Sequence, residues 1–252
     1  LIGGYVQDGF SDEALKCFRK MLDEGVSPQA VTYICILKAC GNAGFLEIGE
    51  DIDAKIRQQG LLQDIVLGTA LVDMYCKCGA LAKAQEVFEQ LPRKDIVAWN
   101  ALITGYAQQG LGDEVLKYFK QMEDENIHPN TITYICALKA CGVIGALKIG
   151  EDIHVKVREK GLLQKDVVLG NTLVDMYFKC GMFEKAREVF EQIPMQDVVS
   201  WNAIITGYSQ CGFSDEALEC FREMKTRGIS PDAVTYICVL KACGIVGSLQ
   251  IG

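Results

Sequence analysis

Residues 197–236, DVVSWNAIITGYSQCGFSDEALECFREMKTRGISPDAVTY, decide the fold because most of this stretch occurs twice. An earlier copy, DIVAWNALITGYAQQGLGDEVLKYFKQMEDENIHPNTITY, begins at Asp95. The related sequences TYICILKACG, TYICALKACG and TYICVLKACG begin at Thr32, Thr133 and Thr235, separated by 101 and 102 residues. Self-similarity at a nearly fixed period indicates a repeat architecture.

Each long period divides again into three kinds of block, which we call standard, long and short. The standard blocks have 35 residues, the long blocks 35 or 36 and the short blocks 31. The standard blocks are Ile96–Asn130 and Val198–Asp232, with Leu1–Gln29 truncated; the long blocks are Ala30–Asp64 and Thr131–Asp166, with Ala233–Gly252 truncated; the short blocks are Ile65–Asp95 and Val167–Asp197.

Every complete block predicts two helices. In Ile96–Asn130, apolar residues recur at helical spacing over residues 98–109 and again over 112–126. Gly110 separates the two patterns, and Pro129 is expected to end the second helix because proline cannot donate a hydrogen bond into it. No segment alternates like a strand between turn residues. Helix pairs that cannot bury their apolar faces alone are expected to stack, which predicts an all-α solenoid.

Composition and charge exclude several classes of function. Half of the 252 residues are hydrophobic, yet the apolar runs are far shorter than the roughly 18 residues of a membrane-spanning helix, so we expect a soluble chain without a membrane partner. The net charge of -8 argues against indiscriminate binding of polyanions. The chain starts at Leu1 inside a block, without a visible targeting segment, so we expect a piece of a longer array.

The residues give no support to an enzyme, a metal site or a cofactor. No CxxC pair occurs among the 12 cysteines, and His128 and His154 lie far apart. The cysteines recur inside apolar helical patterns, which favours small buried side chains in a reducing compartment. No glycine-rich phosphate loop follows a strand and no catalytic triad is recognisable.

The blocks resemble a known family. The standard block, with WNALITGY before a second helix and a late proline, is similar to a pentatricopeptide repeat (PPR), and the regular alternation with long and short blocks resembles the plant PLS subclass of this family. The resemblance implies stacked helix pairs in a right-handed superhelix. It also implies sequence-specific binding of single-stranded RNA at one base per repeat. By the same resemblance, the chain selects sites for C-to-U RNA editing in a chloroplast or mitochondrion.

The resemblance also implies which side chains face the bases. In this family the fifth and last residues of a block contact the base, and the second residue is an apolar wedge between neighbouring bases. The base-recognising pairs would be Thr69 with Asp95, Asn100 with Asn130, Asn171 with Asp197, and Asn202 with Asp232. The wedges would be Val66, Val97, Val168 and Val199. Family usage then predicts the target 5′-N-G-C-N-U-U-3′ for the complete blocks.

Simpler explanations exist for most of these residues. An aspartate before a helix is a good N-cap, worth about 1 kcal/mol, and this role is compatible with base recognition. Trp99 and Trp201 are more consistent with packing between repeats than with base stacking. Lys77 and Lys179 suit either phosphate contacts or a solvated surface, and the lysines of the three LKACG sequences carry the same ambiguity.

The long blocks depart from the pattern, since their fifth residues are Ile34 and Ile135, which have no polar group for a base. A protein-interaction scaffold is therefore the alternative function. In the family that the blocks resemble, long blocks dock small editing-factor proteins, and an apolar side chain fits such a partner better than a base edge.

Overall fold

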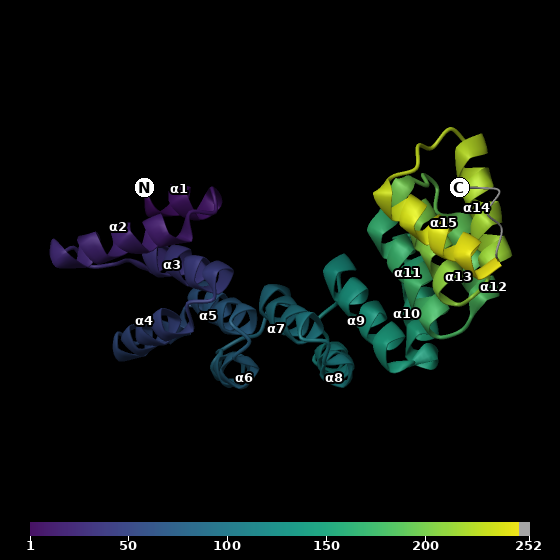
Figure 1. Cartoon of the computed structure of the whole chain (residues 1–252). Helices are drawn as coiled ribbons and strands as arrows, with labels where there is room; N and C mark the ends of the chain where they lie inside the picture. Colours follow the sequence, from purple (N-terminus) through teal and green to yellow (C-terminus); the bar gives the residue numbers. More distant parts are fainter. Residues whose placement is uncertain (247–252) are drawn as a thin grey trace. The chain divides into compact units, whose positions relative to one another are not determined.

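A computed structural model describes residues 1–246, and all regular elements in this range are helical (Figure 1). The contacts divide the chain into two compact units, Leu1–His128 and Pro129–Gly252. The last six residues of the truncated long block Ala233–Gly252 lie outside the described residues. The all-α class predicted from the sequence is confirmed within the described part of the chain.

The first unit contains four helix pairs. Its helices are α1 (Ile2–Gln7), α2 (Ser11–Asp23), α3 (Ala30–Ala43), α4 (Leu46–Gln58), α5 (Ile65–Lys77), α6 (Leu81–Gln90), α7 (Ile96–Gln108) and α8 (Gly112–Asp124), with a short 3-10 helix η1 (Leu61–Gln63) after α4. The odd-numbered helices pack on one another in chain order, and each even-numbered helix packs on the odd-numbered helix before it. Helices α2, α4 and α6 also contact the odd-numbered helix that follows, which joins each pair to the next.

The second unit repeats this arrangement. Its helices are α9 (Thr131–Ile144), α10 (Leu147–Glu159), α11 (Val167–Lys179), α12 (Phe183–Gln192), α13 (Val198–Gln210), α14 (Ser214–Thr226) and α15 (Ala233–Val246). Helices α9, α11, α13 and α15 pack in sequence, and α10, α12 and α14 cover them as in the first unit. Each unit is therefore a stack of helical hairpins.

The helix boundaries follow local backbone chemistry. Gly110 adopts a left-handed φ of 72° between α7 and α8, as the predicted break requires. The end of α8 was expected at Pro129, but α8 ends at Asp124. The reason is Asn126, which adopts a left-handed φ of 59° and turns the chain before the proline is reached.

Aromatic side chains join successive pairs in both units. Trp99 and Trp201 are fully buried, which confirms the packing role expected for them. Trp99 meets Phe88 of the preceding short block edge-to-face at a centroid distance of 4.8 Å, and Trp201 meets Phe190 in the same way at 4.8 Å. Such aromatic pairs contribute about 0.5–1.5 kcal/mol beyond the area they bury.

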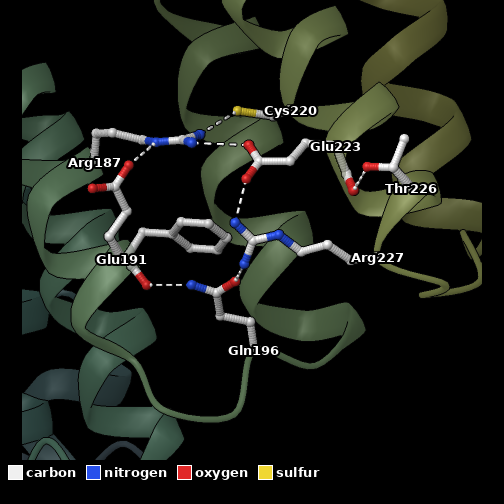
Figure 2. Close-up of polar contacts among 8 residues, drawn as sticks. Arg187, Glu191, Gln196, Cys220, Glu223, Thr226 and Arg227 are labelled. Atoms are coloured by element: carbon white, nitrogen blue, oxygen red, sulfur yellow. Dashed lines mark hydrogen bonds and ion pairs between the residues drawn. The ribbon is translucent and has the colours of Figure 1, made fainter.

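In the second unit a polar network adds to this apolar contact (Figure 2). Arg187 of α12 pairs with Glu191 of its own helix and with Glu223 of α14, both at 2.8 Å. Glu223 also pairs with Arg227, whose guanidinium lies 5.3 Å from the Trp201 ring centroid. Burial alone would raise the pKa of Glu223, but the two arginines lower it. The network therefore ties α12 and α14 together at the edge of the buried tryptophan.

Candidate nucleic-acid interface

The last residue of each complete block caps the first helix of the next block. Asp95 Oδ1 accepts hydrogen bonds from the N–H groups of Val97 and Ala98, both at 3.0 Å. Asp197 Oδ1 accepts from the N–H of Ser200 at 2.9 Å. These caps satisfy backbone donors that a helix start leaves without partners. The capping role expected for these aspartates is confirmed, and it holds their carboxylates at the ends of the odd-numbered helices.

The fifth residue of a block lies in the second turn of its helix. The apolar pattern over residues 98–109 would place Asn100 in the first helical turn, but α7 begins at Ile96, so Asn100 is its fifth residue and lies in the second turn. Asn171 in α11 and Asn202 in α13 are likewise the fifth residues of their helices. The helices begin earlier than the apolar pattern suggested because the aspartate caps allow the first two residues to be helical.

One predicted pair is joined directly by hydrogen bonds. Asn202 Nδ2 lies 3.0 Å from both Oδ1 and Oδ2 of Asp232 and donates to this carboxylate. Thr235 donates from Oγ1 to Asn202 Oδ1 at 2.5 Å. The backbone N–H of Thr235 and the amide of Asn202 together lower the pKa of Asp232. The carboxylate is therefore ionised at neutral pH and holds the amide of Asn202 in one orientation.

Two other predicted pairs are not joined in this way. Within the described residues, no hydrogen bond links Thr69 to Asp95 or Asn171 to Asp197. Thr69 Oγ1 and Asn171 Oδ1 are buried and have no hydrogen-bond partner among the described residues. These two side chains therefore retain unused hydrogen-bonding capacity at the fifth position of the short blocks. Asn100 lies in the first unit and Asn130 in the second.

The expected wedges are exposed apolar side chains. Val66 and Val97 are 64% and 60% exposed, and Val168 and Val199 are 59% and 57% exposed. The second residues of the long blocks, which the sequence analysis did not single out, are exposed as well; they are Val31, Ile132 and Val234. Each block from Ala30 onward therefore has an exposed β-branched residue at its second position. Within each unit these side chains form an apolar row along the odd-numbered helices.

A groove of about 330 Å³ lies between α11 and α13. It is lined by Val199, Asn202 and Thr206 from α13 and by Asp175 and Lys179 from α11. The groove thus brings together Val199, Asn202 and Lys179, which the sequence analysis predicted to be a wedge, a base contact and a phosphate contact. The groove combines apolar side chains with the amides of Asn202 and Gln210 and the ion pair of Lys179 with Asp175.

The two candidate phosphate contacts already have partners. Lys77 pairs with Asp73, and Lys179 pairs with Asp175, each at 2.7 Å between Nζ and Oδ2. Both pairs are part-exposed and link residues four apart on one helix, so each is worth only about 0.3–0.5 kcal/mol. A competing anion can therefore displace the aspartate at small cost.

The long blocks present a different surface at the fifth position. Ile34 in α3 and Ile135 in α9 are half-buried and apolar. They lie one helical turn from the exposed Val31 and Ile132, respectively. These two side chains have no donor or acceptor and cannot form hydrogen bonds with a base edge.

Residues at the third position of a block were missed by the sequence analysis. Thr235, Thr133 and Ser200 each contact the side chain of the preceding block-final residue through a hydroxyl. The signal for them was present, because a serine or threonine three residues after a cap is a recognisable arrangement at a helix start. The contact of Thr235 with Asn202, the fifth residue of the previous block, was not visible in the sequence.

The remaining features of the described residues give no second site. Within residues 1–246, no group of three or more His, Cys, Asp or Glu side chains is arranged to hold a metal ion, and no disulfide joins the cysteines. Burial raises the pKa of the Cys40 and Cys141 thiols to about 12, so these cysteines are protonated core residues. None of the helices in this range is long and apolar enough to cross a membrane.

Comparison with known proteins places these observations in a family. The model of the PPR repeat family matches residues 1–42, 94–142 and 196–244, and a second PPR repeat model matches 69–96 and 171–198. A chloroplastic pentatricopeptide repeat-containing protein of Arabidopsis thaliana is 34% identical over the whole of this chain and 29% of its own length. A putative mitochondrial one from the same plant is 33% identical over the whole chain and 40% of its own length.

Among solved structures, the chain is similar to the pentatricopeptide repeat protein PPR10, crystallised in complex with an 18-nt psaJ RNA element. The TM-score is 0.82 at 24% identity, over all of this chain and 37% of PPR10. At this identity the likeness concerns the fold, a helical solenoid. This chain spans about 30–40% of the length of these relatives. With family models matching most of its blocks, the chain belongs to the PPR repeat family.

Proposed function

We propose that this chain binds single-stranded RNA along the exposed ends of its odd-numbered helices, with one base for each standard or short block. The observation that carries the proposal is the bonded pair of Asn202 and Asp232 at the edge of the groove that Val199 lines. An amide held by a carboxylate can offer a defined hydrogen-bonding edge to an unstacked base. The exposed valine beside it offers an apolar surface for the base plane.

The other predicted pairs fit the same role. Thr69 Oγ1 and Asn171 Oδ1 keep hydrogen-bonding capacity at the equivalent positions. Within each unit, the exposed valine or isoleucine at the second position recurs from block to block, which suits a strand whose bases are separated one by one. Lys77 and Lys179 are proposed to contact phosphates by exchanging their aspartate partners for the RNA backbone.

The base assignments follow from the residue pairs. Thr69 with Asp95 is assigned to G, and Asn100 with Asn130 to C. The pairs Asn171 with Asp197 and Asn202 with Asp232 are assigned to U. The long blocks are left without a base preference because Ile34 and Ile135 are apolar. The proposed target is therefore 5′-N-G-C-N-U-U-3′, with the blocks as the recognition units.

The cellular role that we propose is target selection for C-to-U RNA editing in a plant organelle. PPR10 was crystallised with an RNA element, and the relatives are named as chloroplastic or mitochondrial proteins. The alternation of standard, long and short blocks supports assignment to the PLS subclass. On this proposal the chain recognises the RNA, and the deamination is carried out elsewhere.

A binding assay tests the RNA proposal. Fluorescence anisotropy would compare an RNA containing 5′-N-G-C-N-U-U-3′ with one in which the same bases are permuted, at physiological salt because backbone contacts depend on ionic strength. We expect the predicted RNA to bind at least tenfold more tightly. Equal binding of the two RNAs would contradict the base assignments, and absent binding would contradict RNA recognition by this chain.

A protein-interaction scaffold is the second candidate, favoured by the apolar side chains of the long blocks. Val31 is 70% exposed and Ile132 is 54% exposed, and each lies beside a half-buried isoleucine. If this second function holds, substitution of Ile34 and Ile135 by asparagine would weaken the binding of a protein partner and leave the RNA affinity unchanged. A loss of RNA affinity in this double variant would argue against the scaffold function.

A further inference from the structure

A hydroxyl at the third position of α15 connects the two residues that we assign to one base. Thr235 is fully buried, and its Oγ1 lies 2.5 Å from Asn202 Oδ1 and 3.0 Å from Asp232 Oδ1. The same oxygen accepts the backbone N–H of Asp232 at 3.1 Å, and the N–H of Thr235 donates to Asp232 Oδ1 at 2.9 Å. Thr235 is thus the common neighbour of the amide and the carboxylate.

The chemistry of these groups decides how the Asn202 amide is turned. An ionised carboxylate only accepts hydrogen bonds, so the NH₂ group of Asn202 must face Asp232. A threonine hydroxyl has one proton, and the shorter contact directs it to the amide oxygen of Asn202. The oxygen is therefore occupied by Thr235 and one N–H by Asp232, which leaves the second N–H of the amide as the donor for a ligand.

The other block junctions show what happens when the hydroxyl differs. At Asp95 the third position is Ala98, and the carboxylate accepts from two backbone N–H groups instead. At Asp197 it is Ser200, whose Oγ contacts Asp197 Oδ1 at 3.1 Å, but within residues 1–246 neither residue bonds Asn171, whose Oδ1 has no hydrogen-bond partner there. Of these three junctions, only the one with threonine links the block-final residue to the fifth residue.

We propose that Thr235 is a specificity-determining positioning residue, which fixes the edge that Asn202 presents and so sharpens the base preference of the block Val198–Asp232. This inference rests on the proposed RNA-binding function. The ligand is the base assigned to this block, uracil, which offers carbonyl acceptors to the remaining amide N–H. Thr235 itself does not contact the base, because it is fully buried.

The test separates discrimination from affinity and stability. RNAs carrying U or C at the last position of 5′-N-G-C-N-U-U-3′ would be titrated against the wild-type chain, Thr235→Val and Thr235→Ser. Thr235→Val keeps the shape and removes the hydroxyl, so the ratio of the two dissociation constants should fall about three- to tenfold. Thr235→Ser keeps a hydroxyl and should retain most of the ratio. Thr235→Ala replaces the valine variant if the latter does not fold.

A matched variant shows whether the effect is local. Thr133 occupies the equivalent place behind Asn130, with contacts of 3.2 Å and 3.1 Å to its side-chain oxygen. Thr133→Val should change discrimination at the third base of the target and not at the last. An unchanged U-to-C ratio in folded Thr235→Val, or an equal loss in Thr235→Ser, would overturn the inference. Wild-type binding without any base preference would overturn the proposed function and this inference with it.

Discussion

The exchange of Asn130 for aspartate is expected to move the preference of one block from C to U. Asn130 caps α9 in a reciprocal arrangement, in which Thr133 N–H donates to Asn130 Oδ1 and Asn130 N–H donates to Thr133 Oγ1, both at 3.2 Å. Asp232 makes the same two contacts with Thr235, at 2.9 and 3.1 Å. The structure therefore already contains the arrangement that Asn130→Asp would create.

The magnitudes follow from this equivalence. Asparagine and aspartate are almost equally good caps, so the free energy of unfolding should change by less than about 0.5 kcal/mol. The group offered toward a ligand changes from one that donates and accepts to one that only accepts. A hydrogen bond to a charged group is worth about 1.5–3 kcal/mol, so the C-to-U ratio of dissociation constants should change by about ten- to 150-fold.

Fluorescence anisotropy with two RNAs that differ only at the third base of 5′-N-G-C-N-U-U-3′ measures this ratio, and thermal unfolding by circular dichroism measures the stability. The reciprocal variant Asp232→Asn is the control, since it should act on the last base only. If wild type and Asn130→Asp bind both RNAs with the same preference, the assignment of the block-final residue to base recognition is refuted. A large loss of stability in Asn130→Asp would refute the equivalence of the two caps.

Three further predictions concern packing, pH and salt. An added Cβ at Gly207 would lie 2.2 Å from the Phe178 ring, so Gly207→Ala should destabilise the chain by about 1–3 kcal/mol. Gly4 is at the equivalent position of the first block, and a Cβ there would have no atom within 4 Å, so Gly4→Ala should not lower the melting temperature. Burial, with Arg158 and Lys185 nearby, lowers the pKa of His154. As pH falls below about 6.5 the unfolded chain takes up a proton that the folded site resists, so the melting temperature should fall. His154→Asp introduces the residue found at the equivalent position of the first unit, Asp53, and should make the melting temperature less dependent on pH between 7 and 5.5. An unchanged pH dependence would mean that other groups cause it. Lys179→Ala should reduce the slope of log K against log salt by about 0.7, the value for one phosphate contact on a single strand; an unchanged slope would mean that Lys179 does not contact the backbone.

Much of the local structure was predictable because its causes are local. The apolar spacing of each block predicted the helix pairs, Gly110 marked a break, and the aspartates marked helix starts. The error at the end of α8 has a local cause too, since Asn126 takes a left-handed conformation that asparagine tolerates but does not require. The start of α7 was placed two residues too late, at residue 98, although Ile96 directly follows the Asp95 cap.

The buried and exposed roles of apolar residues were only partly predictable. Trp99 and the wedge Val97 lie two residues apart in one apolar run, yet one is fully buried and the other is 60% exposed. Trp99 packs against Phe88 of the preceding block, whereas Val97 lies on a face of α7 that stays exposed. Hydrophobicity alone does not distinguish these two outcomes.

The amino-acid sequence by itself determined the helix pairs, the caps and the repeat, because each depends on residues within about one block of one another. The tertiary structure decided which side chains meet across blocks. Asn202 and Thr235 are 33 residues apart, and their contact exists only because α13 and α15 pack side by side. Lys179 pairs with Asp175 of its own helix, a contact that depends only on local spacing. In contrast, Lys179 lines the same groove as Asn202 only because α11 packs on α13. The physical reason is that periodicity specifies which face of a helix is buried, whereas the partner of each polar group depends on the register of neighbouring helices.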